Sequence, residues 1–274
     1  MRVIRKAVWW HMAGYKRISD DLRMRIRTGE LKPGELLPLE GPDLTGRYRV
    51  GLSTIRQALD VLVAEGLVDR ALGRGNVVVG EPRRRVERSN ARHQWEKDRA
   101  RLPEAERRST GATERDTGLT KPTLVFHAEY RPAEADKDLA AAFGLPVGTR
   151  LLERIYRTRY VGEDVPFNLT HSYLVHDQVA VNPDLLDPAN EPWPGGTQSQ
   201  LHTIGIELDR VVERVTARPP TDEEARELGM SGCLAVLALR KTCLDVRGRT
   251  VEVSDIRLPG DRTELVFATP LARW

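Results

Sequence analysis

Residues 53–79 read STIRQALDVLVAEGLVDRALGRGNVVV and predict a helix that leads into a hairpin. Apolar residues recur in its first part at spacings of three and four, which is typical of an amphipathic helix; they are Ile55, Ala58, Leu59 and Leu62. We expect Ser53 to cap this helix and Gly66 to end it. Two β-prone runs follow, residues 67–70 and 76–79, with glycines between them that favour a tight hairpin tip.

The residues before this stretch predict two further helices. Between Tyr15 and Leu31 an aliphatic residue recurs every four positions, at Ile18, Leu22 and Ile26, which predicts an amphipathic helix of about four turns. Pro33-Gly34 breaks the chain, and residues 42–48 predict a short polar helix. Three helices followed by a two-stranded hairpin are the layout of a winged helix-turn-helix domain, which we expect over residues 1–80.

Charge divides the 274-residue chain, whose net charge is +3, into two unlike parts. Residues 1–120 carry 25 Lys and Arg against 17 Asp and Glu, whereas residues 121–274 carry 18 against 23. A basic N-terminal part indicates a polyanionic partner. Residues 81–120 hold 11 basic and 8 acidic side chains but few aliphatic ones. We therefore expect residues 81–121 to form a charged basic linker, in which residues 92–106 can form a helix.

The composition argues against several classes of protein. No stretch approaches the roughly 20 apolar residues that a membrane-spanning helix needs, and no long apolar run opens the chain. Cys233 and Cys243 are the only cysteines, too few for a disulfide framework or a zinc site. We therefore expect a cytoplasmic protein that uses no metal or other cofactor.

A weak internal repeat organises the rest of the chain. Residues 133–160 resemble residues 221–244, and each copy predicts a helix, a glycine C-cap and a hairpin. Thr221 with Glu224 matches a capping box, which marks the start of the second helix. Two such copies predict one antiparallel sheet with helices on one face over residues 122–274. The expected fold class of the whole chain is α+β.

The motifs, taken in order, resemble those of GntR-type transcriptional regulators of the HutC branch. In the N-terminal part they are LLPLE at 36–40, STIRQAL at 53–59, EGLV at 65–68 and GRG at 73–75. In the C-terminal part, ERVTA at 213–217 and LPGDR at 258–262 resemble the UTRA module. The resemblance implies a DNA-binding domain followed by a chorismate-lyase-like domain that binds an effector and dimerises. The charged middle segment also resembles Kor-type repressors, which control transfer genes of integrating plasmids.

The resemblance implies that the helix quoted first reads DNA. Its first turn exposes Ser53, Thr54, Arg56 and Gln57, whose groups suit phosphates and guanine edges in the major groove. Gly75 lets the hairpin tip approach the minor groove, where Arg74 supplies positive charge. The alternative is that both arginines are solvated surface residues.

Two departures from the family pattern concern its DNA readers. Gly41 stands where the family usually has an arginine, and Gly51-Leu52 stand where it has Ser-Arg. We therefore expect an operator unlike the common family sequence. Either Arg47 or Arg49 compensates for the missing arginines, or Leu52 contacts a thymine methyl group.

The expected effector site is carried by two predicted strands. Arg157 and Arg159 alternate onto one strand face, and two arginines so spaced can grip one anion. In the UTRA resemblance such a pair holds the anionic group of a small ligand, and Glu252 matches a glutamate that bonds ligand hydroxyls. Thr170 and Leu258 stand where the family often has a glutamate and a tyrosine, which leaves open a more apolar ligand or none. The alternative for the charged residues is a solvated strand face.

The sequence thus predicts a repressor that binds a palindromic double-stranded DNA operator as a homodimer and responds to a small anionic effector. Two alternatives remain: a ligand-independent repressor whose C-terminal domain only dimerises, and a lyase-like enzyme. The enzyme is disfavoured because the histidines His127, His171, His176 and His202 are scattered. The chain also lacks the Gly-x-Ser-x-Gly and His-Glu-x-x-His motifs.

Overall fold

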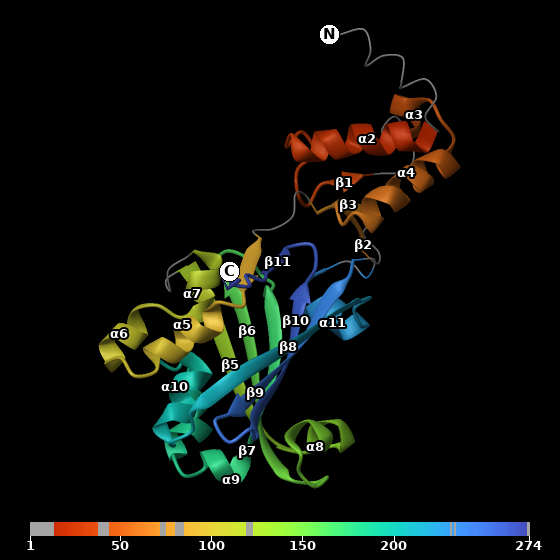
Figure 1. The fold of residues 1–274 in the computed structure, drawn as a ribbon. Helices are drawn as coiled ribbons and strands as arrows, with labels where there is room; N and C mark the ends of the chain where they lie inside the picture. Colours follow the sequence, from red (N-terminus) through yellow and green to blue (C-terminus); the bar gives the residue numbers. More distant parts are fainter. Residues whose placement is uncertain are drawn as a thin grey trace. The chain divides into compact units, whose positions relative to one another are not determined.

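The structure is a computed structural model that describes residues 14–37, 44–71, 75–79, 85–118, 123–230, 232 and 234–272. The chain divides into two units, Met1–Arg84 with Met230–Leu234, and Arg85–Gly229 with Ala235–Trp274 (Figure 1). No helix among these described residues is long and apolar enough to cross a membrane.

The first unit consists of three helices and a small sheet. Its elements are α2 (Gly14–Arg27), β1 (Leu36–Leu37), α3 (Leu44–Tyr48), α4 (Leu52–Ala64), β2 (Val68–Ala71) and β3 (Gly75–Val78). The strands pair antiparallel in the order β1-β3-β2. The aliphatic residues predicted to face inward from α2 and α4 are fully or nearly fully buried in one core. The winged helix-turn-helix fold is confirmed.

The ends of α4 differ from the prediction. The helix begins at Leu52, so Ser53 lies inside its first turn and does not cap it. The capping position is Gly51, which has no side chain to accept a hydrogen bond. At the other end the helix stops at Ala64, and Gly66 follows at φ 73°, a left-handed conformation that glycine adopts at little cost.

The second unit is built on a six-stranded antiparallel sheet of order β5-β6-β7-β10-β9-β8. Its strands are β5 (Leu124–Glu134), β6 (Arg150–Tyr160), β7 (Asn168–Val175), β8 (Leu208–Arg218), β9 (Val236–Asp245) and β10 (Thr250–Pro259). The order follows from two copies of a strand-helix-strand-strand unit. One copy is β5, α8 (Lys137–Phe143), β6 and β7; the other is β8, α11 (Asp222–Glu227), β9 and β10. The copies meet where β7 pairs with β10, and the capping box of Thr221 and Glu224 starts α11 as predicted.

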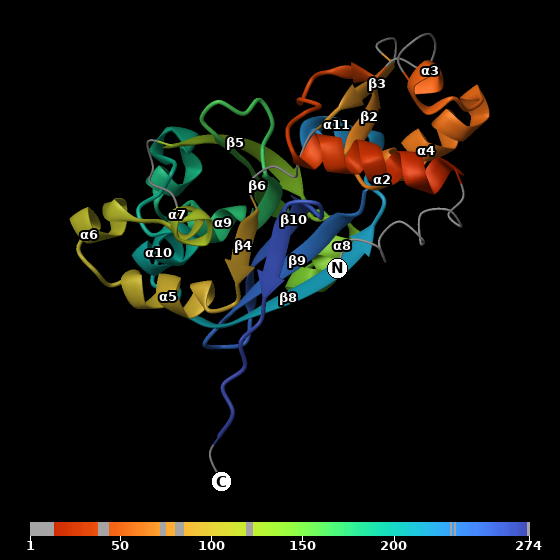
Figure 2. The same cartoon turned by 90° about the horizontal axis from the view of Figure 1, so that it is seen from above.

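Helices cover both faces of this sheet, not one face as the repeat predicts (Figures 1 and 2). The repeat helix α8 packs on one face, in a core that includes Leu151 and Val253. On the opposite face Leu201 of α10 (Gly196–Thr203) packs with Leu152 and Leu174. The short α9 (His176–Val179) and the 3-10 turns Pro183–Leu186 and Pro188–Asn190 precede α10. The second layer therefore comes from segments outside the repeat.

Residues 85–118, the described part of the segment expected to be a linker, belong instead to the second unit. They form β4 (Val86–Ser89), α5 (Arg92–Arg99), α6 (Glu104–Ser109) and α7 (Ala112–Thr117). β4 pairs in parallel with β11 (Thr263–Val266). The helix expected over residues 92–106 is interrupted at Pro103, which caps α6. The segment folds with few aliphatic residues because its charged groups are paired inside the unit; Arg88, for example, lies 2.5 Å from Glu213.

Candidate functional site

The first turn of α4 presents uncommitted polar groups. Ser53, Arg56 and Gln57 are exposed and Thr54 is half-exposed, while the other side of the helix is buried in the core. Because Gly51 provides no side-chain cap, the first backbone N–H groups of α4 remain open to an anion such as phosphate. Within the described residues, no hydrogen bond or ion pair engages the Arg56 guanidinium. Such a turn suits the major groove of DNA.

Two arginines near this turn are also accessible. Arg47 lies on α3 and is exposed, with its guanidinium carbon 6.0 Å from the centre of the Tyr48 ring. Arg49 follows α3, is exposed and has a left-handed backbone with φ 53°. Leu52 is half-buried at the start of α4. The three predicted replacements for the missing family arginines are therefore at least partly exposed, and their contact with DNA stays a prediction. Gly41 lies outside the described residues.

The predicted minor-groove contact lies at the tip of the hairpin in the first unit. Strands β2 and β3 pair antiparallel, with Ala71 opposite Gly75. Gly75 is exposed at φ 85°, and a Cβ placed there would meet no atom within 4 Å. Arg74 lies outside the described residues, so its role stays a prediction.

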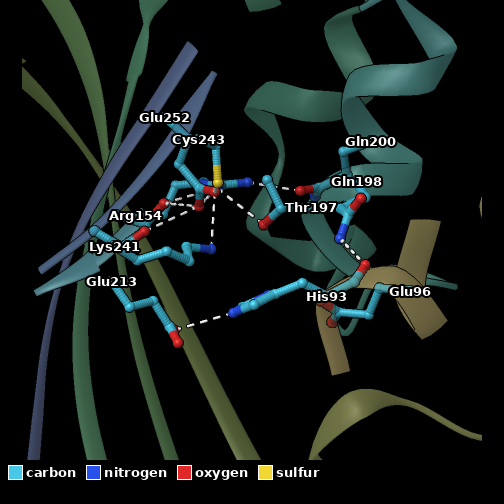
Figure 3. Close-up of polar contacts among 12 residues, drawn as sticks. His93, Glu96, Arg154, Thr197, Gln198, Gln200, Glu213, Lys241, Cys243 and Glu252 are labelled. Carbon is cyan, nitrogen blue, oxygen red and sulfur yellow. Dashed lines mark hydrogen bonds and ion pairs between the residues drawn. The ribbon is translucent and has the colours of Figure 1, made fainter. Parts of the chain in front are cut away.

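The second unit contains a cavity of about 460 Å³ on the α10 face of the sheet. Strands β6, β7, β9 and β10 line one side of it. The opposite wall comes from β4, α5, residues 111–116 and residues 191–200. Figure 3 shows side chains from the strands and from these helices pointing toward one another. A cavity of this size can enclose a small organic ligand.

Glu252 lies at the centre of the sheet side of this cavity and is 1% exposed. Its Oε1 accepts hydrogen bonds from Arg154 Nη2, Ser172 Oγ and Ser254 Oγ at 3.1, 2.7 and 3.0 Å. Its Oε2 lies 2.8 Å from Lys241 Nζ. Burial acts to raise the pKa of Glu252, but the charges of Lys241 and Arg154 outweigh it and hold that pKa well below its usual range. Glu252 is therefore a buried carboxylate shared by two cations.

A second ionic network joins the segment before β5 to the sheet. Arg88 of β4 donates a hydrogen bond to Glu213 of β8 at 2.5 Å, and the ring of His93 lies 3.2 Å from the same carboxylate. Burial acts to raise the pKa of Glu213, but His93 and Arg88 together hold it well below its usual range. Arg92 of α5 pairs with Asp116 of α7. The contacts with Glu213 fix β4 and α5 to the sheet, and the Arg92–Asp116 pair joins α5 to α7.

The four predicted effector residues do not come together. Thr170 and Glu252 both line the cavity. Arg157 and Arg159 lie on the opposite face of β6, where Arg157 donates to Glu227 of α11 at 3.0 Å and Arg159 to a backbone carbonyl at 2.9 Å. The interpretation of this pair as an anion grip in the cavity is therefore corrected: strand alternation turns both arginines away from it.

The residues of β6 that face the cavity are those that alternate with Arg157 and Arg159 along the strand. Tyr156 and Thr158 line the cavity, and Arg154, 1% exposed, lies beneath it. Arg154 donates to Gln200 of α10 at 2.6 Å, besides its bond to Glu252. Lys241 and His93 also lie at the cavity and were not predicted from the sequence. No pattern in the sequence distinguishes Arg154, Tyr156 and Thr158, because β6 is buried on both faces and alternation alone does not say which face meets the cavity.

Comparison with known families identifies the class of this protein. Residues 14–78 match the family of bacterial regulatory proteins called gntR, and residues 123–264 match the UTRA domain. The chain belongs to the GntR family of regulators that carry a UTRA domain. The resemblance to Kor-type repressors stays a prediction.

Full-length relatives of this GntR-UTRA regulator are transcriptional regulators. It is 25% identical over 259 residues to the HTH-type transcriptional repressor NagR of Bacillus subtilis (strain 168), covering 92% of this chain and 93% of NagR. It is 27% identical over 248 residues to the mannosyl-D-glycerate transport/metabolism system repressor MngR of Escherichia coli (strain K12), covering 89% and 90%. A crystal structure of a GntR-family transcriptional regulator is 26% identical, with a TM-score of 0.59 over 95% of this chain and 99% of that one. The protein is therefore a DNA-binding transcriptional regulator, and its family is not one of enzymes.

Proposed function

We propose that this GntR-UTRA regulator represses transcription by binding a palindromic operator as a homodimer, and that a small molecule in the cavity changes its affinity for that operator. The exposed first turn of α4 is the observation that carries the DNA-binding part. It offers Arg56, Gln57 and two hydroxyls beside an uncapped helix N-terminus. Two copies of this turn in a symmetric dimer would read two half-sites about one helical turn of DNA apart.

A gel-shift assay tests the DNA-binding proposal. The probe is the DNA upstream of the protein's own gene, and the competitors are the same DNA and a scrambled sequence of equal length. We expect the specific competitor to displace the protein at far lower concentration, and light scattering of the complex to give two chains per operator. Equal displacement by both competitors would remove the specificity claim, and one chain per operator would remove the dimer.

The cavity supports the regulatory part of the proposal. Its wall includes β4 and α5, which follow the first unit directly along the chain. A ligand that contacts this wall would change the packing of the segment that leads to the DNA-binding unit. A ligand shifts the equilibrium between two conformations of the protein only if it binds one of them more tightly than the other.

A thermal-shift screen of the purified full chain separates this proposal from a ligand-independent repressor. A ligand at 100 times its dissociation constant should add about 2.7 kcal/mol of stability. Any compound that raises the melting temperature is then added to the gel shift. If compounds bind in the cavity yet leave operator affinity unchanged, the regulatory part fails while specific DNA binding stands.

A further inference from the structure

Aromatic residues are few in this chain, and a third of them line the cavity. Only 15 of its 274 residues are Phe, Trp or Tyr. Five of these 15 line the cavity, namely Trp95, Phe126, Tyr156, Phe167 and Trp193. Phe126 and Tyr156 form a continuous surface on β5 and β6, with ring centres 5.5 Å apart. Aromatic walls of this kind favour a ligand that contains rings.

The cations near the cavity are already engaged. Lys241 lies 2.8 Å from Glu252, and Arg154 beneath it shares the same carboxylate. Arg88 pairs with Glu213, and Arg92 pairs with Asp116. Arg99 donates to two backbone carbonyls. Each of these five cations therefore has at least one acceptor within the described residues, although the Nε–H groups of Arg88, Arg92 and Arg99 are buried without one.

The total charge around the cavity gives an anion no advantage. Five guanidinium or ammonium groups, those of Arg88, Arg92, Arg99, Arg154 and Lys241, are matched by six carboxylates in the described lining and directly behind it. The carboxylates are Glu96, Glu114, Asp116, Glu191, Glu213 and Glu252. A ligand phosphate or carboxylate that displaced one of these ion pairs would leave a carboxylate buried without its partner, which is costly.

Neutral polar groups remain available to orient a ligand. Thr170 is half-exposed on the cavity side of β7, and its hydroxyl makes no hydrogen bond within the described part of the chain. The Oε1 of Glu191, by contrast, is already saturated, since it accepts from Tyr130, Tyr156 and Gln200 at 2.6, 2.8 and 2.9 Å. The polar contacts on offer thus suit hydroxyl, carbonyl or amide groups.

Part of this wall lies outside the two ranges that match the family models. Residues 79–122 lie between the two ranges that match the family, yet Arg88, Arg92 and Trp95 from this segment line the cavity. We propose that the cavity takes an uncharged ring compound bearing hydroxyl, carbonyl or amide groups, and excludes sugar phosphates and other anions. This inference rests on the proposed ligand-regulated function.

A matched pair of probes tests the charge preference. Coumarin-3-carboxamide and coumarin-3-carboxylate have nearly the same shape and differ in charge, and glucose 6-phosphate represents the sugar phosphates. Isothermal titration calorimetry of the full chain at pH 7 measures all three. We expect the carboxamide to bind at least tenfold more tightly than the carboxylate, because a carboxylate would be buried without a free cation, and glucose 6-phosphate to show no binding at millimolar concentration.

Two phenylalanine variants tie the binding to the cavity. Phe126→Ala removes part of the aromatic surface and should weaken carboxamide binding roughly tenfold. Phe267→Ala makes the same change at a side chain that is 60% exposed and outside the cavity lining, and should leave binding unchanged. Circular dichroism checks that both variants are folded.

Three outcomes would overturn the inference. These are carboxylate binding as tight as that of the carboxamide, no binding by either coumarin, and equal effects of the two phenylalanine variants. Binding of glucose 6-phosphate that also changes operator affinity would overturn this ligand class while leaving the proposed function intact. Loss of specific operator binding in the gel shift would instead count against the proposed function.

Discussion

Replacing Glu252 by Gln should strongly destabilise the second unit. The carboxylate is 1% exposed and is shared by Arg154 and Lys241, whose side chains are 1% and 17% exposed. Glutamine keeps the shape and one acceptor oxygen, but it removes the only carboxylate within 4 Å of either cation in the described residues. The NH₂ group of the glutamine would also lie against a donor that, in the unchanged protein, bonds to a carboxylate oxygen of Glu252. Breaking a buried ion pair from one side costs about 3 to 5 kcal/mol.

Hydrogen exchange followed by mass spectrometry is the suitable measurement, because the chain has two units and a single melting curve would combine them. The amides of β7 and β10 should lose about 3 to 5 kcal/mol of protection in Glu252→Gln. The control is Glu227→Gln, whose partner is Arg157. Both of those side chains are 28% exposed, so the loss there should stay within about 1 kcal/mol.

A double variant checks that stranded charge is the cause. Adding Lys241→Met to Glu252→Gln removes one of the two uncompensated cations and should recover part of the lost protection. If Glu252→Gln costs less than about 1 kcal/mol, or the double variant is less stable than the sum of the single changes, the reasoning about the buried cluster is refuted.

Three further predictions concern acid stability, DNA reading and the end of α4. The pKa of Glu224 is lowered from 4.5 to about 2, chiefly by its hydrogen bond from Arg218. The stability that the ionised Glu224 contributes to the folded state is therefore complete above about pH 4.5 and is lost toward pH 2. Urea unfolding at several pH values should show less acid destabilisation in Glu224→Gln than in the unchanged protein. Arg56→Ala should cost roughly 1 to 3 kcal/mol of discrimination at one operator base, whereas Arg27→Ala on the exposed side of α2 should not change base preference; an unchanged preferred sequence in the Arg56 variant would contradict the placement of the recognition helix. Gly66→Ala should destabilise the first unit by about 1 to 2 kcal/mol in urea unfolding, because φ is 73° there, and a neutral effect would show that the backbone can relax.

The local structure of this protein was largely predictable from the sequence. The four-residue spacing of Ile18, Leu22 and Ile26 predicted α2, because one face of an amphipathic helix must be buried. The capping box of Thr221 and Glu224 predicted the start of α11. Each of these signals depends on residues close in sequence. The repeat also predicted the antiparallel sheet, because each copy was expected to supply a hairpin.

The side chains that surround the cavity were decided by the tertiary structure. Alternation correctly placed Arg157 and Arg159 on one face of β6, but both faces of that strand are buried, as Leu151 and Leu152 show, so the pattern carried no sign of which face meets the cavity. The charged segment before β5 was expected to stay outside the core for lack of aliphatic residues. It packs into the second unit because partners far away in the chain, such as Glu213 for Arg88, neutralise its charges. Long-range pairing of this kind leaves no periodic trace in a sequence, and only the folded chain shows it.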